Sequence, residues 1–519
     1  MRGAFVGTLL SLLAVLPDSR RVSAQPITFA EHVAPVIFRR CTPCHQPGGI
    51  GPMPFTSYRE TVAYGAMIDY VTRTGYMPPW RAATSYGTFD HSLQLSAAEL
   101  DRIARWVKGG FARGPELMAD AWKAYRPRPA PEPEWDLELT MIEPFEQYGI
   151  YFDQYQVFRL PTGLTEDRWV AAVGFEPGDA SIVRYVSVSV NTDPAAARLD
   201  DWDPRYGYTS FGGPGMVPDT EGWFTWSPGD PPFSQGPNRF LPAGAELLLY
   251  VHYGPTGQQK TDRSMIRLKF ADPKPGKPAS RHVALFHPAA NGAESFTVPA
   301  GEEHWVQSSL RLPVALTVHA LEPHGLLLAN AWEIYARRPD GGTVKLLKIP
   351  DYDVHWRRAY RLAAPLTLPA GTVVHARARY DNRAGNPALP DDRPVAAGWG
   401  ATIFDEQFLL RFRLTLPPPA PGFRILPTAG NQRDTLRRVR CVLPVGAEGS
   451  YRLRLRSFGE VETNLTVPLE AGVTTADLSL NDLPYGTYAL LLEDAEGRYL
   501  AGDLLVYWPP ELTKTILDD

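Results

Sequence analysis

Cysteine is scarce in this chain, and its scarcity excludes a disulfide-stapled secreted scaffold. Three cysteines occur in 519 residues, whereas such scaffolds depend on several closely spaced pairs. An excess of one charge is also missing, because 52 Lys and Arg stand against 57 Asp and Glu. No broad basic field therefore favours a nucleic-acid partner. Beyond the N-terminal segment, no apolar run reaches the roughly 18 residues of a transmembrane helix, which excludes a polytopic membrane protein.

Turn-forming residues, in contrast, are abundant. The chain holds 51 prolines and 44 glycines, and 44% of its residues are hydrophobic. This composition is typical of folded proteins built from short strands and many turns. The length predicts about three or four domains.

The N-terminus has the pattern of a targeting segment. Arg2 gives a positive start, residues 4–16 form a short apolar run, and residues 22–24 read Val-Ser-Ala, a small-residue cleavage site. Together they predict a secretory signal peptide over residues 1–24. We therefore expect an exported protein, periplasmic or extracellular, with no transmembrane segment.

Residues 25–115 are predicted to form a small all-α domain. Ser/Thr-x-x-Glu capping boxes begin at Thr28, Ser57 and Ser96, each before spaced apolar residues. The box at Ser96 starts the clearest helix, which two glycines at 109 and 110 should end.

Composition changes after this region. A proline-rich linker covers residues 116–134, and strand-like runs with Pro, Gly and Asp turns follow it, as in β-sandwiches or jelly rolls. The predicted β-domains are residues 135–272, 273–416 and 423–519.

Cys41-Thr-Pro-Cys44-His45 is the strongest chemical signature. Two thiols two residues apart can join both vinyl groups of a haem, and the adjacent histidine is then held as an iron ligand. A redox dithiol does not need His45. A zinc site needs a second Cys/His pair, whereas the remaining cysteine, Cys441, stands far along the chain. We therefore predict haem c, attached through Cys41 and Cys44 and ligated by His45.

A second axial ligand is expected from the same region. Met77 lies in a Met-Pro-Pro-Trp segment, whose prolines stiffen the loop and expose the residue before them. Met53 is the alternative, Met67 is expected in a helix core, and His91 is a further candidate. We favour ligation by His45 and Met77, which raises the reduction potential relative to two histidines.

These motifs make residues 25–115 resemble a bacterial cytochrome c domain. The resemblance rests on Phe29-Ala-Glu-His-Val-Ala-Pro-Val-Ile, the Cys-x-x-Cys-His motif, Met-Pro-Pro-Trp and the helix that contains Trp106. It implies a small electron-transfer domain of a type that often precedes a copper module.

Residues from about 135 to 416 resemble the copper type II, ascorbate-dependent monooxygenases, the family of peptidylglycine α-hydroxylating monooxygenase. The matching stretches, in chain order, are Leu160-Pro-Thr-Gly-Leu-Thr-Glu-Asp-Arg-Trp169, Val251-His-Tyr-Gly-Pro-Thr-Gly257, Glu322-Pro-His-Gly325, Tyr380-Asp-Asn382, Trp399-Gly400 and Asp405-Glu406. The resemblance implies two jelly-roll β-domains with one copper each. The expected fold class is therefore multidomain and mainly β: a small all-α cytochrome c domain, two jelly-roll β-sandwich domains and a C-terminal β-sandwich.

The family's copper ligands carry over only in part. His252 and His324 each match one ligand position, one in each copper site. The other positions differ: Arg184-Tyr185 stands for a His-His pair, Leu326 for a histidine and Gln407 for a methionine. Arginine and leucine have no lone pair to donate to a metal, and Cu(I) prefers imidazole and thioether.

Copper is therefore possible but not expected, and we interpret His252 and His324 as hydrogen-bonded or core histidines. His304, His319 and His355 could substitute from nearby, although none has the family's spacing.

The sequence predicts an exported c-type cytochrome that exchanges electrons with a redox partner protein, its β-domains serving as a docking surface. Two alternatives stay open. One is a haem-fed, copper-dependent monooxygenase or oxidoreductase with a rebuilt metal site. The other is a subunit of an exported electron-transfer complex, held through its β-domains.

Overall fold

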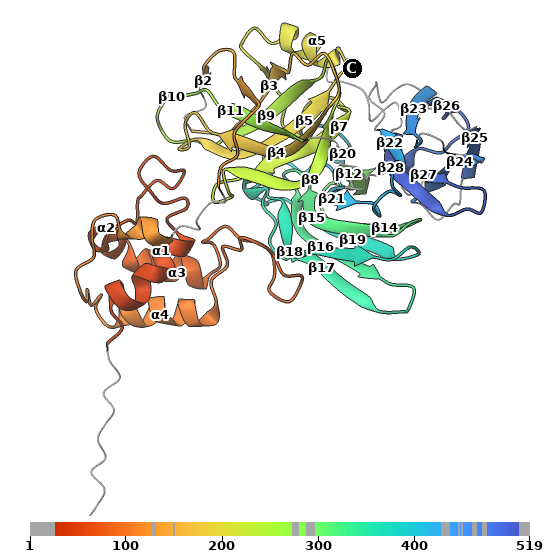
Figure 1. The fold of residues 1–519 in the computed structure, drawn as a ribbon. Helices are drawn as coiled ribbons and strands as arrows, with labels where there is room; N and C mark the ends of the chain where they lie inside the picture. The colour runs from red at the N-terminus through yellow and green to blue at the C-terminus, as the bar shows by residue number, and fades with distance from the viewer. Residues whose placement is uncertain are drawn as a thin grey trace, which may run out of the picture.

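The computed structural model is mainly β, with a small helical region near the N-terminus (Figure 1). It describes residues 26–125, 131–148, 151–271, 280–286, 296–426, 436–444, 447, 450–458, 464–469 and 475–507. The predicted signal peptide lies outside these ranges. Within them, no helix has the length and apolar character needed to cross a membrane.

The helical region packs around a small aromatic core that includes Phe29, Phe38 and Trp106. Its elements are η1 (Phe29–Val33), α1 (Ala34–Arg40), α2 (Tyr58–Ala63), α3 (Gly65–Arg73), α4 (Ala97–Lys108) and η2 (Ala121–Tyr125).

The predicted capping boxes differ in outcome. At Ser96 both halves of the box form, and Gly110 follows α4 with a φ of 77°, as expected for a helix stop. The box at Ser57 forms its first half, with the Ser57 hydroxyl accepting a backbone N–H. At Thr28 no cap forms, because the hydroxyl donates to the Glu31 carboxylate and the chain enters a π-helical turn.

The first β-unit, residues 137–271, consists of two sheets around one core. The sheets have the orders β1-β11-β4-β8 and β6-β3-β9-β5-β7, with the pair β10-β2 in addition. Its elements are β1 (Leu137–Thr140), β2 (Phe145–Gln147), β3 (Gln154–Pro161), β4 (Arg168–Glu176), β5 (Val183–Asn191), α5 (Ala195–Trp202), β6 (Tyr208–Thr209), β7 (Thr220–Trp226), β8 (Phe233–Leu241), β9 (Glu246–Tyr253), β10 (Lys260–Asp262) and β11 (Met265–Ala271).

Strand β9 contains His252 and is buried on both faces, so each of its side chains points into one of two cores. Leu247, Leu249 and Val251 pack in the core of the first β-unit. Leu248 and Tyr250 point the other way, into a core shared with the next unit. Side chains alternate along a strand, so His252 lies on the face toward the second unit.

The second β-unit, residues 280–415, also has two main sheets. Their orders are β12-β21-β15-β18 and β14-β19-β16-β17, and β13 pairs with β20. Its elements are β12 (Ser280–Phe286), β13 (Thr297–Val298), β14 (Glu303–Arg311), β15 (Leu316–His324), β16 (Ala329–Arg337), β17 (Thr343–Ile349), η4 (Val354–Trp356), β18 (Tyr360–Leu368), β19 (Val373–Asp381), β20 (Ala397–Gly398) and β21 (Leu409–Thr415).

The C-terminal unit, residues 424–507, has a three-stranded sheet β22-β23-β26 and a four-stranded sheet β25-β24-β27-β28. Its strands are β22 (Arg424–Leu426), β23 (Leu436–Val442), β24 (Tyr451–Ser457), β25 (Asn464–Leu469), β26 (Thr475–Ser479), β27 (Gly486–Glu493) and β28 (Tyr499–Tyr507). Cys441 is buried in the core between them, as expected for a packed thiol rather than a nucleophile.

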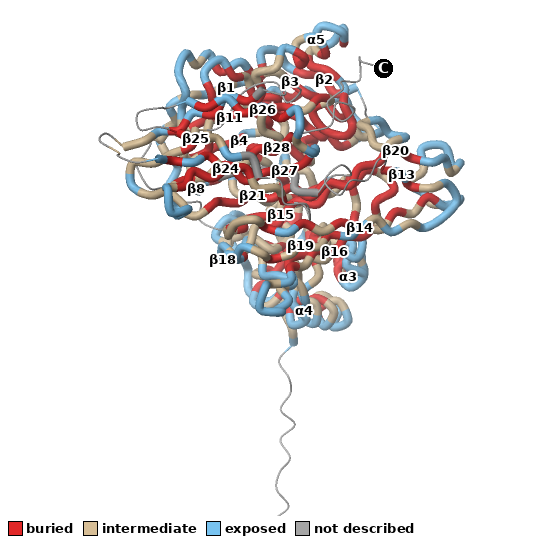
Figure 2. The backbone as a smooth tube through the Cα atoms, turned by 90° about the vertical axis from the view of Figure 1, so that its right-hand side faces the viewer, coloured by how far each residue is buried: buried red, intermediate tan, exposed pale blue. Residues whose placement is uncertain are grey.

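One large hydrophobic core connects the units, and buried backbone runs through the middle of the molecule in Figure 2. It includes Trp80 from the helical region, Tyr185 from the first β-unit, Trp332 from the second and Leu491 from the C-terminal unit. The helical region and the three β-units therefore share buried contacts, in addition to the cores that lie within single units.

The helical region docks on the second β-unit through residues 78–95, here called the docking segment. The N–H of Ala83 donates to the carbonyl of Lys348 at 2.8 Å, and that of Asp90 to the carbonyl of Arg361 at 2.8 Å. Trp80 packs edge-on against Tyr360, with ring centroids 5.3 Å apart. Backbone pairing and aromatic packing together fix the helical region against β17 and β18.

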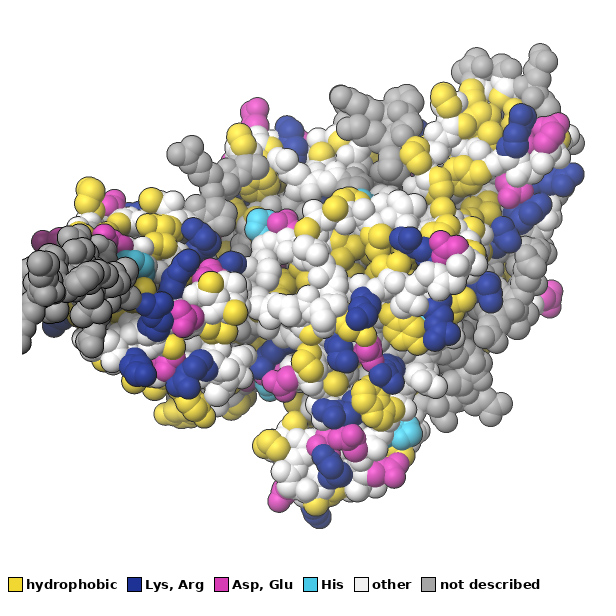
Figure 3. All heavy atoms as spheres, turned by 90° about the horizontal axis from the view of Figure 1, so that it is seen from below, with side chains coloured by type: hydrophobic (Ala, Val, Ile, Leu, Met, Phe, Trp, Pro, Cys, Tyr) yellow, Lys and Arg dark blue, Asp and Glu magenta, His cyan; other side chains and the backbone are white. Residues whose placement is uncertain are grey.

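Charged side chains are mixed on the surface. The face seen in Figure 3 carries cationic and anionic groups interspersed with apolar ones. This pattern agrees with the near balance of 52 cationic and 57 anionic residues.

Candidate functional site

The Cys-x-x-Cys-His loop follows directly on α1. Cys41 is the C-cap of that helix, and the N–H groups of Cys44 and His45 donate to its carbonyl at 3.1 and 2.9 Å. The Nδ1 of His45 lies 2.8 Å from the Met53 carbonyl oxygen, and its ring stacks on Phe55 with centroids 4.6 Å apart. When Nδ1 donates to a carbonyl, the lone pair of a neutral imidazole lies on Nε2, which can then ligate a metal.

Both cysteines of the loop are half-buried, and their surroundings disfavour the thiolate form. Burial raises the pKa of Cys41 to about 12 and that of Cys44 to about 11. A reactive dithiol has a lowered pKa, because the thiolate is the nucleophile. The two residues are not joined by a disulfide.

The three candidate methionines lie in different surroundings. The Met53 carbonyl occupies the Nδ1 side of His45, away from Nε2, and the residue packs against the helical core. Met67 is 54% exposed on α3, so the prediction that it belongs to the core is wrong: this side of α3 faces solvent. Met77 is half-buried in the loop after α3, where its N–H donates to the Val71 carbonyl at 3.0 Å. His91, the remaining candidate, pairs with its neighbour Asp90.

His252 belongs to a cluster of possible metal ligands formed by both β-units. Its Nε2 is 2.7 Å from Oδ1 of Asp153, and the Nδ1 of His355 is 3.5 Å from Oδ2 of the same carboxylate. One ligand atom from each residue lies within 4.8 Å of the others. Two imidazoles and one carboxylate form a donor set that iron, zinc or copper can use.

The electrostatics of this cluster favour a neutral His252. Its side chain is 1% exposed, and burial lowers its pKa to about 4, so the ring carries no competing positive charge at neutral pH. Its Nδ1 has no hydrogen-bond partner. Arg184 donates to Oδ1 of Asp153 at 2.8 Å, so a bound metal would share this carboxylate with a guanidinium group.

His324, in contrast, is surrounded by hydrogen-bond partners. Its Nδ1 lies 3.5 Å from Nη1 of Arg357 and 3.2 Å from Nη1 of Arg411, and its Nε2 lies 3.2 Å from the Gly212 carbonyl oxygen. Burial, reinforced by the two guanidinium groups, holds its pKa well below the usual value. Both ring nitrogens are engaged, and two adjacent positive charges repel a metal ion.

Arg357 lies between the two histidines that match the copper family. It is 3% exposed and sits 6.0 Å from the ring centroid of Tyr155, which stacks on His252 with centroids 4.5 Å apart. The rings of Tyr185 and Tyr250 are 5.9 and 5.7 Å from the same guanidinium carbon. Tyrosine rings attract this charge through their π-faces, so the side chain is stabilised where it is.

The remaining sequence candidates do not join these clusters. His319 lies 3.1 Å from the hydroxyl of Thr415, and His304 lies 3.8 Å from Glu302. Tyr185 donates to the carboxylate of Glu322, and the Gln407 amide donates to the Gly400 carbonyl. The Gln407 side chain also interacts with His324, whereas Tyr185 is held by Glu322.

Comparison with known proteins assigns no family to this chain. No family model and no curated protein match it. Solved structures with some likeness include a β-D-glucuronidase from Dictyoglomus thermophilum, at 13% identity over 40% of this chain and 36% of that chain with a TM-score of 0.12. A β-1,2-glucanase from Parabacteroides distasonis has 11% identity over 46% of this chain and 33% of that chain, with a TM-score of 0.14. The chain spans about a third of each of these proteins, and likeness at this level carries no conclusion about fold or activity.

Sequence reasoning missed Asp153 as a ligand and named His355 only as one of three histidines that could substitute from nearby. Asp153 and His252 are 99 residues apart, and Asp153 and His355 come from different units. No spacing motif marks such a cluster, because the fold alone brings its members together. A signal was present only in the copper resemblance, which directed attention to His252.

Proposed function

We propose that this protein is an exported c-type cytochrome, which transfers electrons through a haem attached to Cys41 and Cys44. The observation that carries the proposal is the fixed imidazole of His45. Its Nδ1 is held by the Met53 carbonyl at 2.8 Å, so Nε2 is left for iron. In this proposal residues 25–115 are a cytochrome c domain, and the first two β-units are a monooxygenase-like, jelly-roll scaffold.

The chain segment from the thiol loop to Met77 carries exposed apolar side chains that support this assignment. Four large apolar side chains in this stretch are exposed: Tyr64 at 37%, Met67 at 54%, Tyr70 at 64% and Tyr76 at 55%. A grouping of exposed apolar side chains marks a binding surface. A haem would supply one-electron chemistry here, while His45 and Met77 would hold its iron and the apolar side chains would exclude water.

The thiol loop also lies close to the β-units, as expected if electrons pass between them. A Cβ at Gly229, in the turn after β7, would lie 3.7 Å from the Cβ of Pro43. Arg358 of the second unit lies over the ring of Trp80 at 5.4 Å, and its charge counteracts the effect of burial on Cys44. A haem bound to Cys44 would therefore lie beside the scaffold rather than apart from it.

The test uses holoprotein made with the cytochrome c maturation machinery. Haem should stay with the polypeptide in acidified organic solvent. The Met77→Ala variant should lose the far-red sulfur-to-iron charge-transfer band, and the matched Met53→Ala variant should keep it. Haem that extracts freely would refute covalent attachment, and the reverse pattern in the two variants would refute the choice of Met77.

The cluster of Asp153, His252 and His355 favours a second candidate, a haem-fed oxidoreductase with a rebuilt metal site. The donor set is two imidazoles and one carboxylate, typical of non-haem iron enzymes that activate oxygen, rather than the imidazole and thioether set that suits Cu(I). Electrons from the haem would then take the place of ascorbate.

Metal analysis separates the two candidates. The second candidate predicts about one equivalent of iron, zinc or copper in purified protein, lost in His355→Ala and kept in His319→Ala, whose histidine is bound to Thr415 instead. Absence of metal after reconstitution with each ion would leave electron transfer alone as the function.

A further inference from the structure

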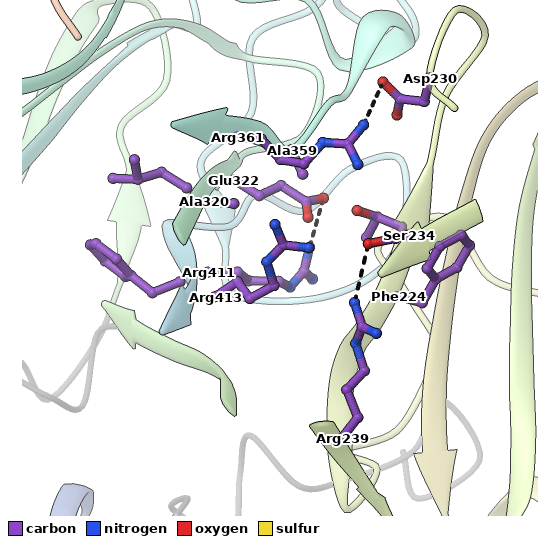
Figure 4. Close-up of a pocket in the computed structure, with 13 residues that line it drawn as sticks. Phe224, Asp230, Ser234, Arg239, Ala320, Glu322, Ala359, Arg361, Arg411 and Arg413 are labelled. Carbon is purple, nitrogen blue, oxygen red and sulfur yellow. Dashed lines mark hydrogen bonds and ion pairs between the residues drawn. The ribbon is translucent and has the colours of Figure 1, made fainter. Parts of the chain in front are cut away.

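Four arginines are among the thirteen residues that line a small cavity between the first two β-units (Figure 4). It has a volume of about 30 Å³. Arg239 reaches it from β8 of the first unit, and Arg361, Arg411 and Arg413 reach it from β18 and β21 of the second. Arg411 and Arg413 share one face of β21, because they are two residues apart on a strand.

The carboxylates around this cavity are already paired with two of these arginines. Arg361 lies 3.5 Å from Asp230, which also pairs with Arg358 at 3.4 Å. Arg411 lies 3.6 Å from Glu322 and also pairs with a second glutamate of the first unit. These pairs leave no carboxylate of the lining for the other two arginines.

Arg239 and Arg413 form no ion pair with the described part of the chain. Arg239 is 2% exposed, and its single hydrogen bond joins Nη2 to the Ser234 hydroxyl at 3.4 Å. The Nε and Nη1 of Arg239 and the Nε of Arg413 are buried without a partner. Buried guanidinium donors without acceptors are costly, because the protein replaces neither the lost water nor the lost counter-charge.

Both side chains nevertheless stay charged at neutral pH. Burial, reinforced by Arg413 and Arg361, lowers the pKa of Arg239 to about 9. Burial and the neighbouring Arg361 lower the pKa of Arg413 to about 10. The Trp223 ring, 5.9 Å from the guanidinium carbon of Arg239, offers its π-face to one of these charges, but no carboxylate of the described residues pairs with either.

We propose that the cavity binds the carboxylate group of a small organic acid between Arg239 and Arg413. A guanidinium group presents parallel N–H donors that match the two oxygens of a carboxylate. The cavity volume of about 30 Å³ exceeds the roughly 10–15 Å³ that one water molecule needs by the same measure, so a small polar group fits. The ligand is either a free short acid or the head group of a longer one that enters between the units. This site is independent of the proposed haem and of the metal cluster.

The experiment titrates the full holoprotein with formate, acetate, succinate and phosphate at constant ionic strength. Calorimetry and the melting temperature are both recorded. Formate or acetate should bind saturably and raise the melting temperature. Tighter binding of succinate would identify the head group of a longer acid, and tighter binding of formate would identify a free short acid. No saturable binding, or binding of phosphate alone, would overturn the proposal.

Variants locate the site. Arg239→Gln and Arg413→Gln should each weaken carboxylate binding at least about tenfold, because each removes one charged partner. Arg438→Gln is the matched control, since this arginine is 71% exposed on the C-terminal unit. In buffer without carboxylate, Arg239→Gln should melt higher than the wild type, because an uncompensated buried charge is gone. If that variant does not fold, Arg413→Gln decides, and unchanged affinity in a folded variant would refute the site.

Discussion

Trp80 is expected to hold the helical region on the second β-unit. It is 8% exposed and packs between Tyr360 and Phe89, with centroids 5.3 and 6.2 Å away. Replacing a buried tryptophan by alanine typically costs about 3–5 kcal/mol. Because the ring joins two units, we expect most of this loss to weaken their contact rather than either core.

The predicted effect of Trp80→Ala is local and measurable by hydrogen exchange. The bridging amides of Ala83, Asp90 and Ala363 exchange only when the docking segment opens. A loss of about 3 kcal/mol in the opening free energy corresponds to roughly 100-fold faster exchange at these amides.

The control is Trp202→Ala, because Trp202 is 68% exposed on α5 and contributes little packing. Amides in α4 and β9 should keep their exchange rates in both variants. Unchanged exchange at the bridging amides of Trp80→Ala would show that the backbone pairs hold the segment without the ring, and the reasoning would fail.

Two further outcomes concern His324. Restoring the family ligands with Leu326→His and Gln407→Met should not create a copper site, because Arg357 and Arg411 already hold His324. Titration with Cu(I) checks this, and stoichiometric binding by the double variant would contradict it. The lowered pKa of His324 also makes the folded protein less stable as pH falls below about 6.5, because the unfolded chain binds a proton that the folded chain does not. His324→Gln should therefore take up about one proton less than the wild type on unfolding near pH 5. Calorimetry in buffers of different ionisation enthalpy measures this uptake. Equal uptake by the two proteins would contradict the prediction.

Local patterns in the sequence predicted local structure well. The capping box at Ser96, the spaced apolar residues after it and the glycines that follow all appear as α4 and its end. The mainly β character also followed from short strand-like runs between turns. These features depend on neighbours in the chain, which is why periodicity and turn chemistry suffice to predict them.

Contacts between distant segments were not predictable in the same way. Met67 was expected in a core because it lies on a helix, but an amphipathic pattern does not say which face meets another element. Phe89 pairs with Leu362 across two units, and nothing near either residue marks the partner. The cluster around His252 and the arginine cavity share this origin, since each is assembled from strands of different sheets.

The shared core has a consequence for truncated forms of the protein. Phe458, Ala489 and Leu491 of the C-terminal unit belong to the same buried cluster as Trp80 and Leu416. A fragment ending near residue 416 would lack Phe458, Ala489 and Leu491. The apolar surface that they cover would then be exposed to water and prone to self-association. Truncations at the proline-rich linkers should therefore yield aggregates where the whole chain yields a folded molecule, and point substitutions are the sounder way to dissect its parts.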